Sequence, residues 1–278
     1  MPAKIIAHSI SEAGKEIITF QLSYWRAIHG ELKTHRAFST SSMSSRAVPV
    51  AKMIAQVRQD PFIPKHVGRN QPGMQAHEPL TPAEREEFLA VWLSNAQNAA
   101  WAAQQMSNLG VAKQIANRVL EPYQIMHTVV TATEFDNFYA LRRHADAEPH
   151  FHDLADEMWE AAKASTPIVR SSQHCRDDER GWHLPYISDA ERGMYLPSKL
   201  IMASAARCAR VSYLNHDGTS PEVAKDLDLF ERLAGSAPIH ASPLEHQAEA
   251  AYRADQESRN FRGWHQHREI FEDALHAQ

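Results

Sequence analysis

A run of hydroxyl side chains between two arginines is the part of the sequence best suited to chemistry. The segment THRAFSTSSMSSR covers residues 34–46. Hydroxyls, backbone N–H groups and the guanidinium fork of arginine are the groups that bind phosphate in proteins. The run therefore predicts an anion site. A solvated serine-rich loop is an equally simple interpretation, because serine clusters are common in loops.

Other nucleotide and metal sites lack their usual motifs here. The sequence has no G-x-G-x-x-G, and its only closely spaced glycine pair, in GRNQPG, lacks the Lys-Ser/Thr of a P-loop. Among the 17 histidines, the closest pairs are His150 with His152 and His265 with His267. Neither pair has cysteines or an H-E-x-x-H helix beside it. We therefore predict solvated histidines and no metal.

Composition excludes several classes of partner. The 278 residues carry 29 Lys and Arg against 34 Asp and Glu, a formal charge of −5, which argues against binding to a nucleic-acid polymer. Cys175 and Cys208 are too few for a disulfide framework and lack C-x-x-C spacing, as expected in a reducing cytoplasm. There is no apolar run of 18 residues and no signal peptide pattern. We expect a cytoplasmic protein without a membrane partner.

The elements that would position the hydroxyl run can be read from periodicity. Apolar alternation and the turn-forming Gly14 predict a β-hairpin, and helical spacing predicts a helical middle. Without a repeat or a linker, we predict one α+β domain over residues 1–278, a β-ribbon or sheet packed on a helix layer. The predicted elements are strands over 3–10 and 15–25, a proline-rich loop over 49–79, and helices over 82–108, 111–120, 131–144 and 151–164.

The hydroxyl run also resembles the R-H-R-x7-S signature of the flavin-dependent thymidylate synthases, the ThyX family. His35, Arg36 and Ser44 are in register, and Thr34 replaces the first arginine. GVAKQIANRVLEPY followed by TEFDNFYALR resembles the family's helical block, in which Arg142 matches the arginine that contacts the pyrimidine. Two further resembling blocks are ARCARVSY at 206–213 and HASPLEH at 240–246. The family places these two before the signature, so the chain resembles a circularly permuted member.

Membership would imply methylation of dUMP to dTMP. Methylenetetrahydrofolate would donate the carbon, NADPH-reduced FAD would supply the hydride, and a homotetramer would place the sites at subunit junctions. Arg142 would be catalytic, because a guanidinium at the carbonyl edge favours a ring that is nucleophilic at C5. The implied substrate-binding residues are Ser44, Ser45, Arg46, Asn117, Arg118, Gln266 and Arg268. The implied flavin-binding residues are His35, Arg36, Ser39, Asn137, Ser212, His240, Ser242 and Glu245.

Some residues depart from the family pattern. The segment TATEFDN lacks the asparagine and arginine that contact the flavin in the family. Asp146 occupies the position of a histidine that faces the flavin in the family. The family's R-Q-x-x-R before the signature histidine is replaced here by Gly30-Glu31-Leu-Lys-Thr34. The tail NFRGWHQHR could replace the lost arginine through Arg268, or be an exposed basic terminal helix. His240 could equally cap a turn.

Three other functions remain open at this point. The first is a UMP methylase of nucleoside-antibiotic biosynthesis, and the second is a base-modifying phage homologue. The third belongs to another class: a nucleotide-binding or nucleic-acid-binding module that has lost its flavin. The acidic net charge weighs against the third function.

Overall fold

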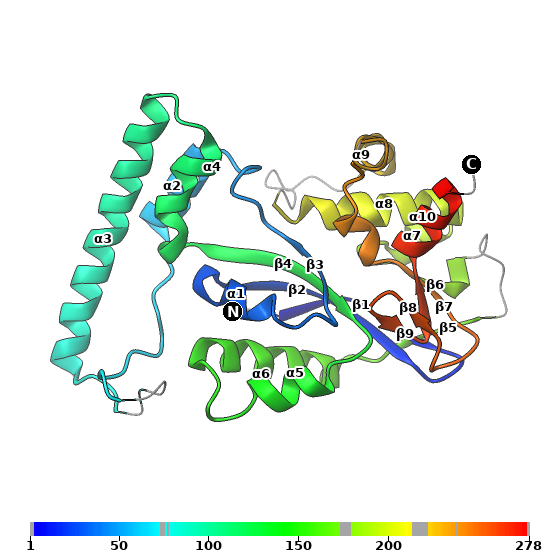
Figure 1. Ribbon diagram of the computed structural model, residues 1–278, viewed down its shortest axis with the longest axis horizontal. Coiled ribbons are helices and arrows are strands. Elements are labelled where there is room, and N and C mark those ends of the chain that lie inside the picture. Colours follow the sequence, from blue (N-terminus) through cyan, green and yellow to red (C-terminus); the bar gives the residue numbers. More distant parts are fainter. Residues whose placement is uncertain are drawn as a thin grey trace.

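A five-stranded sheet forms the centre of the molecule, with the strand order β3-β4-β2-β1-β5 (Figure 1). Neighbouring strands are antiparallel, except that β5 runs parallel to β1. The strands are β1 (Ala3–Ser11), β2 (Glu16–Trp25), β3 (Ser39–Ser42), β4 (Ile125–Ala132) and β5 (Ile168–Arg170). The computed structural model describes residues 3–72, 76, 78–172, 179–212, 222–236 and 238–276, without the side chains of residues 179 and 212.

The first two strands form the predicted β-hairpin. Gly14 lies in its turn with φ of 84°, a conformation that glycine adopts without steric penalty. Both faces of β2 are buried, since Phe20 and Leu22 belong to one hydrophobic cluster and Ile17 to another. The sheet is therefore an inner layer of the molecule, and different elements must pack against each of its two faces.

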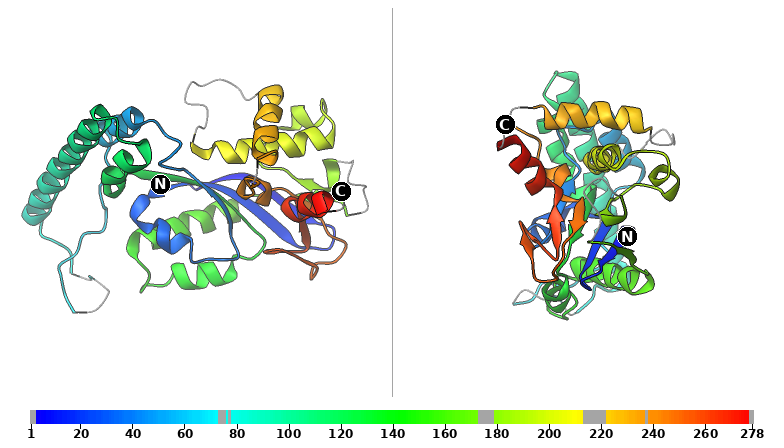
Figure 2. Two further views of the ribbon diagram at one scale, coloured as in Figure 1. Left: turned by 45° about the horizontal axis from the view of Figure 1, so that its top comes forward. Right: turned by 90° about the vertical axis from the view of Figure 1, so that its right-hand side faces the viewer.

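Helices cover both faces of the sheet. On one face lie α5 (Asp136–Arg142) and α6 (Pro149–Ala164), whose apolar side chains share a cluster with Phe20 (Figure 1). On the other face lies α8 (Pro197–Ala209), where Cys208 packs against Val129 of β4 (Figure 2). The predicted α+β class is confirmed, but the helices form a layer on each side of the sheet.

The helix predicted over 131–144 is wrong at its start. Residues Ile125–Ala132 form strand β4, and the helix begins only at Asp136. The strand sequence IMHTVVTA is rich in β-branched residues, which pack well on a pleated surface. Val130 and Val129 of β4 belong to hydrophobic clusters on opposite faces of the sheet, so the strand is buried on both faces and lacks the alternation that marks an exposed strand.

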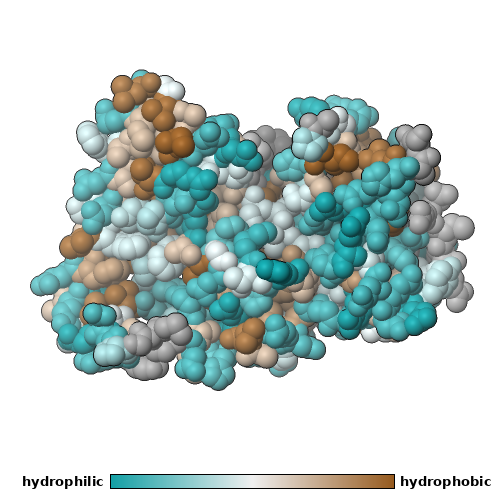
Figure 3. All heavy atoms as spheres, viewed as in Figure 1, coloured by the Kyte–Doolittle hydropathy of each residue, from teal (hydrophilic) through white to brown (hydrophobic). Residues whose placement is uncertain are grey.

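A helical arm extends from one end of the sheet (Figure 1). Its long helix α3 (Pro82–Asn108) has the predicted bounds and begins with a capping box between Thr81 and Glu84. The loop predicted over 49–79 is wrong in part, because it contains helix α2 (Val50–Gln59). Apolar atoms gather at the far end of the arm (Figure 3), where Trp101 and Leu109 are 62% and 81% exposed. The arm also contains α4 (Lys113–Ala116) and the 3-10 helix η2 (Asn117–Tyr123).

Apart from η1 and α1, which follow β2, the rest of the chain consists of short elements on the same side of the molecule as α8 (Figures 1 and 2). Within the described ranges, no helix is both long and apolar enough to cross a membrane. The short helices are η1 (Arg26–Ile28), α1 (His29–Leu32), η3 (Glu179–Gly181), α7 (Asp189–Arg192), η4 (Arg210–Ser212), α9 (Val223–Ala234), η5 (Ser242–Glu245) and α10 (His267–His276). The short strands are β6 (Trp182–His183), β7 (Ala248–Ala250), β8 (Glu257–Ser258), β9 (Phe261–Arg262) and β10 (Trp264–Gln266).

Candidate functional site

The signature residues 34–38 form a connection between α1 and β3 that is anchored by Phe38. This ring is 7% exposed and lies 5.1 Å from Phe138 of α5, centroid to centroid. His35 stands edge-on to the same Phe138 ring at 5.0 Å. The signature is thereby fixed against α5, the helix that ends in Arg142.

Arg142 is held in place by three side chains from α1 and the connection that follows it, namely Glu31, Thr34 and His35. Its Nη1 lies 3.0 Å from a Glu31 carboxylate oxygen, and its Nε donates to Nε2 of His35 at 3.0 Å. Its Nη2 donates a weaker bond to Thr34 at 3.4 Å, and the guanidinium lies 4.6 Å over the ring of Phe151. Arg142 therefore has a fixed orientation and keeps donor capacity on Nη2.

His35 is neutral in this arrangement. Burial, followed by the charge of Arg142, lowers the pKa of its imidazole. Because Nε2 accepts a hydrogen bond from Arg142, the ring proton lies on Nδ1. The pair thus presents one cation, partly balanced by Glu31, beside a neutral ring.

A pocket of about 220 Å³ opens beside these residues. It brings together His35, Arg36, Asn137 and Arg142, four of the residues predicted from the sequence. The side chain of Arg36 is exposed and makes no hydrogen bond or ion pair with any residue that the structure describes. Since typical small-molecule pockets range from about 300 to 1,000 Å³, this one has room for a ring and not for a whole dinucleotide.

The predicted phosphate-binding residues Ser44, Ser45 and Arg46 lie in the next loop, between β3 and α2. Ser45 is buried, and its carbonyl accepts from Nδ2 of Asn117 at 2.9 Å. The same amide donates to the carbonyl of Val48 at 3.1 Å, so the fully buried Asn117 holds the loop over 45–48 in shape. Arg46 and Arg118 are exposed, and Arg118 forms an ion pair with Glu121 at 2.8 Å.

The HASPLEH block docks directly on the signature strand. His246 is hydrogen-bonded to Ser41 of β3 and to Thr131 of β4, each at 2.9 Å. Before it, η5 carries Ser242 and Glu245 to the neighbourhood of β3. The block therefore lies against the signature in space although almost 200 residues separate them in the sequence.

Gln266 and Arg268, from the tail NFRGWHQHR, contact the HASPLEH block. Gln266 is 1% exposed, and its amide donates to Ser39 at 3.1 Å and to the carbonyl of Glu245 at 3.3 Å. Arg268 pairs with Glu245 and, at 2.8 Å, with Glu272. Two carboxylates thus already surround the guanidinium that was predicted to replace the lost phosphate-binding arginine.

The two remaining predicted flavin residues are His240, just before η5, and Ser212, in the 3-10 helix η4 that contacts β3 and β4. His240 is exposed, and its backbone N–H donates to the carbonyl of Leu233 at 3.2 Å. Ser212 ends η4, and its side chain lies outside the described residues, as does the whole of Cys175.

The ARCARVSY block has a structural task in this chain. Arg207 is 4% exposed and lies 2.5 Å from Glu191 and 2.7 Å from Asp226, which is 0% exposed. Arg210 also pairs with Asp226. These ion pairs tie α7, α8 and α9 together, and Cys208 between them is buried and free.

Two residues of the site carried no recognisable role in the sequence. Glu31 is the ion-pair partner of Arg142, and it was noted only as a departure from the family pattern. Asn260 donates to the carbonyl of Ala37 at 3.1 Å and to Ser39 at 3.0 Å, which fixes the signature from the other end of the chain. No spacing pattern in the sequence predicts a contact between residues that are more than 220 positions apart in the chain.

Comparison with known proteins supplies the class of this fold and site. A sequence model of the family described as thymidylate synthase complementing protein matches residues 8–168, more than half of the chain. The chain belongs to this family, and the resemblance to the flavin-dependent thymidylate synthases is confirmed. At the family level this supports a flavin-dependent enzyme that methylates a pyrimidine nucleotide. The match contains the signature and Arg142, whereas the two later blocks follow it, and the circular permutation stays a prediction.

Two solved structures of such enzymes match about half of the chain at low identity. The UMP/dUMP methylase PolB from Streptomyces cacaoi, bound with 5-Br UMP, is 16% identical over 55% of this chain and 70% of that chain, with a TM-score of 0.46. The flavin-dependent thymidylate synthase ThyX from Helicobacter pylori, complexed with FAD and dUMP, is 19% identical over 52% and 67%, with a TM-score of 0.36. No curated protein sequence matches the chain.

Proposed function

We propose that the protein methylates C5 of dUMP to give dTMP. Methylenetetrahydrofolate is the carbon donor in this proposal, and FAD reduced by NADPH supplies the hydride when bound. The observation that carries the proposal is the convergence of His35, Arg36, Asn137 and Arg142 on one pocket within the segment that the family matches.

Arg142 is the proposed catalytic residue because it is a fixed cation at the wall of the pocket. Glu31 and His35 orient it from one side, which leaves Nη2 to face the carbonyl edge of the pyrimidine. A guanidinium there stabilises negative charge on the ring as C5 attacks the one-carbon unit. His35 stays neutral, so it adds no competing positive charge.

The residues fit a flavin in part. Arg36 offers a guanidinium without a partner in the described chain, and Asn137 offers an exposed amide beside it. These two, with His35 and Ser39 and with Ser242 and Glu245 of η5, are the proposed flavin-binding residues of one subunit. His240 and Ser212 are proposed to join them from elsewhere in the assembly.

The nucleotide phosphate is proposed to bind at Ser44, Ser45 and the exposed Arg46. Asn117 shapes this loop, because its amide holds the carbonyls of residues 45 and 48. The exposed Arg118 would add positive charge from the solvent side of this loop. Gln266 and Arg268 are proposed as secondary contacts, although both already have protein partners.

We propose a homotetramer in which neighbouring subunits complete each site. A pocket of about 220 Å³ is too small for a flavin dinucleotide and a nucleotide together, so further walls are required. The exposed Trp101 and Leu109 of the helical arm offer an apolar surface for such contacts.

Purification of the full-length protein tests the flavin directly. We expect bound FAD, and we expect NADPH to bleach its absorbance faster in the presence of dUMP. The Arg36→Ala variant should lose FAD, whereas Arg58→Ala, which removes an exposed arginine on α2, should keep it. Product analysis with dUMP and with UMP then identifies the substrate.

A colourless protein would contradict the proposal if added FAD leaves both its absorbance and its melting temperature unchanged, because a bound ligand must stabilise the fold. Nucleotide binding without flavin would instead favour a binding module. Methylation of UMP alone would favour the nucleoside-antibiotic branch.

A further inference from the structure

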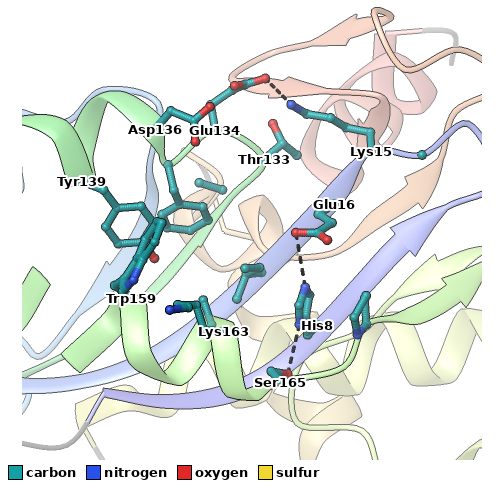
Figure 4. A pocket seen from close by; sticks show the side chains of 16 residues that line it. His8, Lys15, Glu16, Thr133, Glu134, Asp136, Tyr139, Trp159, Lys163 and Ser165 are labelled. Carbon is teal, nitrogen blue, oxygen red and sulfur yellow. Dashed lines mark hydrogen bonds and ion pairs between the residues drawn. The ribbon is translucent and has the colours of Figure 1, made fainter. Parts of the chain in front are cut away.

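A second pocket, of about 540 Å³, lies next to the candidate site (Figure 4). Its walls come from the β1–β2 hairpin, from the turn after β4 and from α6. None of the residues proposed above to bind substrate or flavin lines it, and Glu134 is the residue that the two pockets share. Because its volume is in the usual range for small-molecule sites, the pocket has room for a ligand of its own.

The charged side chains that a ligand would meet in this pocket are mostly acidic. Lys15 and Glu134 neutralise each other, with Nζ 2.5 Å from a carboxylate oxygen. Asp136 and Lys163 are exposed and form no hydrogen bond through their side chains, nor any ion pair, in the part of the chain that the structure describes. The side chain of Glu16 is 53% exposed. Two carboxylates and one ammonium are thus available to a ligand.

An aromatic wall separates the two ends of the pocket (Figure 4). Tyr139 and Trp159 form this wall, edge to face at 4.9 Å between centroids. Asp136 lies at one end of the wall and Lys163 at the other, where its ammonium is 5.8 Å from the centroid of Trp159. Glu16 lies across from the wall. A ligand placed along the wall would meet a carboxylate at one end, an ammonium at the other and a second carboxylate at its side.

The walls of the pocket also carry hydrogen-bonding atoms that have no partner. Oη of Tyr139 and Nε2 of His8 have none within the described residues, and both residues are only 8% exposed. Nδ1 of His8 is bonded to Ser165 at 3.0 Å, which fixes the ring. Burial raises the pKa of Tyr139 and lowers that of His8, so both groups are neutral. Buried polar atoms without partners are uncommon, and a polar ligand seated here would supply them.

We propose that this pocket binds a basic α-amino acid of the arginine and lysine class. Such a molecule carries two cationic groups and one carboxylate, the inverse of the two carboxylates and one ammonium that the pocket offers. Its side-chain cation suits Asp136, its α-carboxylate suits Lys163, and its α-ammonium suits Glu16. Its aliphatic stem packs on Trp159 and Tyr139, as the stems of basic side chains do on apolar surfaces.

The charges argue against other ligands in the same place. A dicarboxylate or a phosphate ester would meet more like charges than opposite ones. A simple diamine would leave the ammonium of Lys163 facing two cations, whereas the carboxylate of an amino acid pairs with it. This ligand is independent of the proposed function, because the methylation uses no amino acid. Asp136 and Tyr139 belong to α5, the helix that ends in Arg142, so a bound amino acid would also hold that helix in place.

Calorimetric titration of the full-length protein tests this site with three probes. L-arginine carries all three charges, L-citrulline lacks the side-chain charge, and agmatine lacks the carboxylate. The wild type should bind arginine roughly fivefold tighter than either of the others. Asp136→Asn should remove the advantage of arginine over citrulline, and Lys163→Gln its advantage over agmatine, each with a roughly fivefold loss of arginine affinity. Glu160→Gln, which removes an exposed carboxylate on α6 outside the pocket, is the matched control and should behave as the wild type.

The variants should keep the melting temperature of the wild-type protein. If Asp136→Asn lowers it, the comparison of arginine with agmatine in Lys163→Gln decides alone. The proposal is wrong if arginine at millimolar concentration does not bind the wild type, or if it binds all four proteins equally. Displacement of arginine by dUMP or FAD would also overturn it, because the pocket would then belong to the candidate site. The expected pattern in a protein without FAD would support the amino-acid pocket while the proposed function fails.

Discussion

Acidification from pH 7.5 to 5.5 should destabilise this protein through its buried histidines. His246 and His267 lie in the interior, and burial lowers their pKa values to about 3 and about 4 respectively. Burial also lowers the pKa of His183. These rings are neutral in the folded state at both pH values, whereas in the unfolded chain they take up protons below about pH 6.5. Their stabilisation is therefore present above pH 6.5 and is lost as the pH falls.

The magnitude follows from proton linkage. Between pH 7.5 and 5.5, each histidine with a folded pKa of 4 or below shifts the free energy of unfolding by about 1.4 kcal/mol. His246 and His267 together give a loss of about 3 kcal/mol, and His183 acts in the same direction. The ion-pair carboxylate of Glu191 does not contribute in this window. Burial raises the pKa of Glu191, but hydrogen bonds from Arg207 and Ser188 outweigh burial and lower this pKa to about 2. Protonation of Glu191 therefore reduces the stability of the fold only below about pH 4.5.

Urea unfolding followed by tryptophan fluorescence at the two pH values measures this loss. His246→Gln removes one titrating ring, so the variant should lose about 1.4 kcal/mol less than the wild type over the same range. His144→Gln, which removes an exposed histidine, should behave like the wild type. A wild-type loss below about 1 kcal/mol, or equal losses in the wild type and His246→Gln, would refute the reasoning.

Two other substitutions test the arginines. Arg142→Lys keeps the charge but loses the planar fork, so turnover should fall roughly tenfold or more while FAD stays bound, and normal steady-state rates would make Arg142 structural. Arg207→Leu leaves Asp226 buried with one partner fewer, and urea unfolding should show a loss of about 3 to 5 kcal/mol. Arg232→Leu, an exposed position on α9, should lose less than about 1 kcal/mol.

Local signals were enough to predict the hairpin and helix α3. Both depend on residues that are close in the sequence, such as the turn at Gly14 and the capping pair Thr81 and Glu84. Helix α2 also had a local signal, because its buried residues Val50, Met53, Ile54 and Val57 follow helical spacing. The prolines downstream of it favoured a loop over the whole region, and that preference outweighed the periodicity.

The end of the chain could not be predicted in this way. The tail was expected to bind nucleotide or to be an exposed basic helix, yet Trp264 is 0% exposed and β10 pairs with β7. Burial there depends on Ile17 of the hairpin, which shares a cluster with Trp264. A contact between residues almost 250 positions apart has no signature in local composition.

The same reasoning explains why sequence order matters little to this site. His246, Asn260 and Gln266 come from the last part of the chain, and each hydrogen-bonds β3 or the loop before it. A further chain of buried hydrogen bonds joins Thr131 to Thr19 at 2.7 Å and Thr19 to His183 at 2.8 Å. Separation of the two segments would leave these polar groups without partners in the interior, at about 1 to 3 kcal/mol each. The segment after the family match is therefore an integral layer of the fold, and it holds the signature in position whatever its place in the chain.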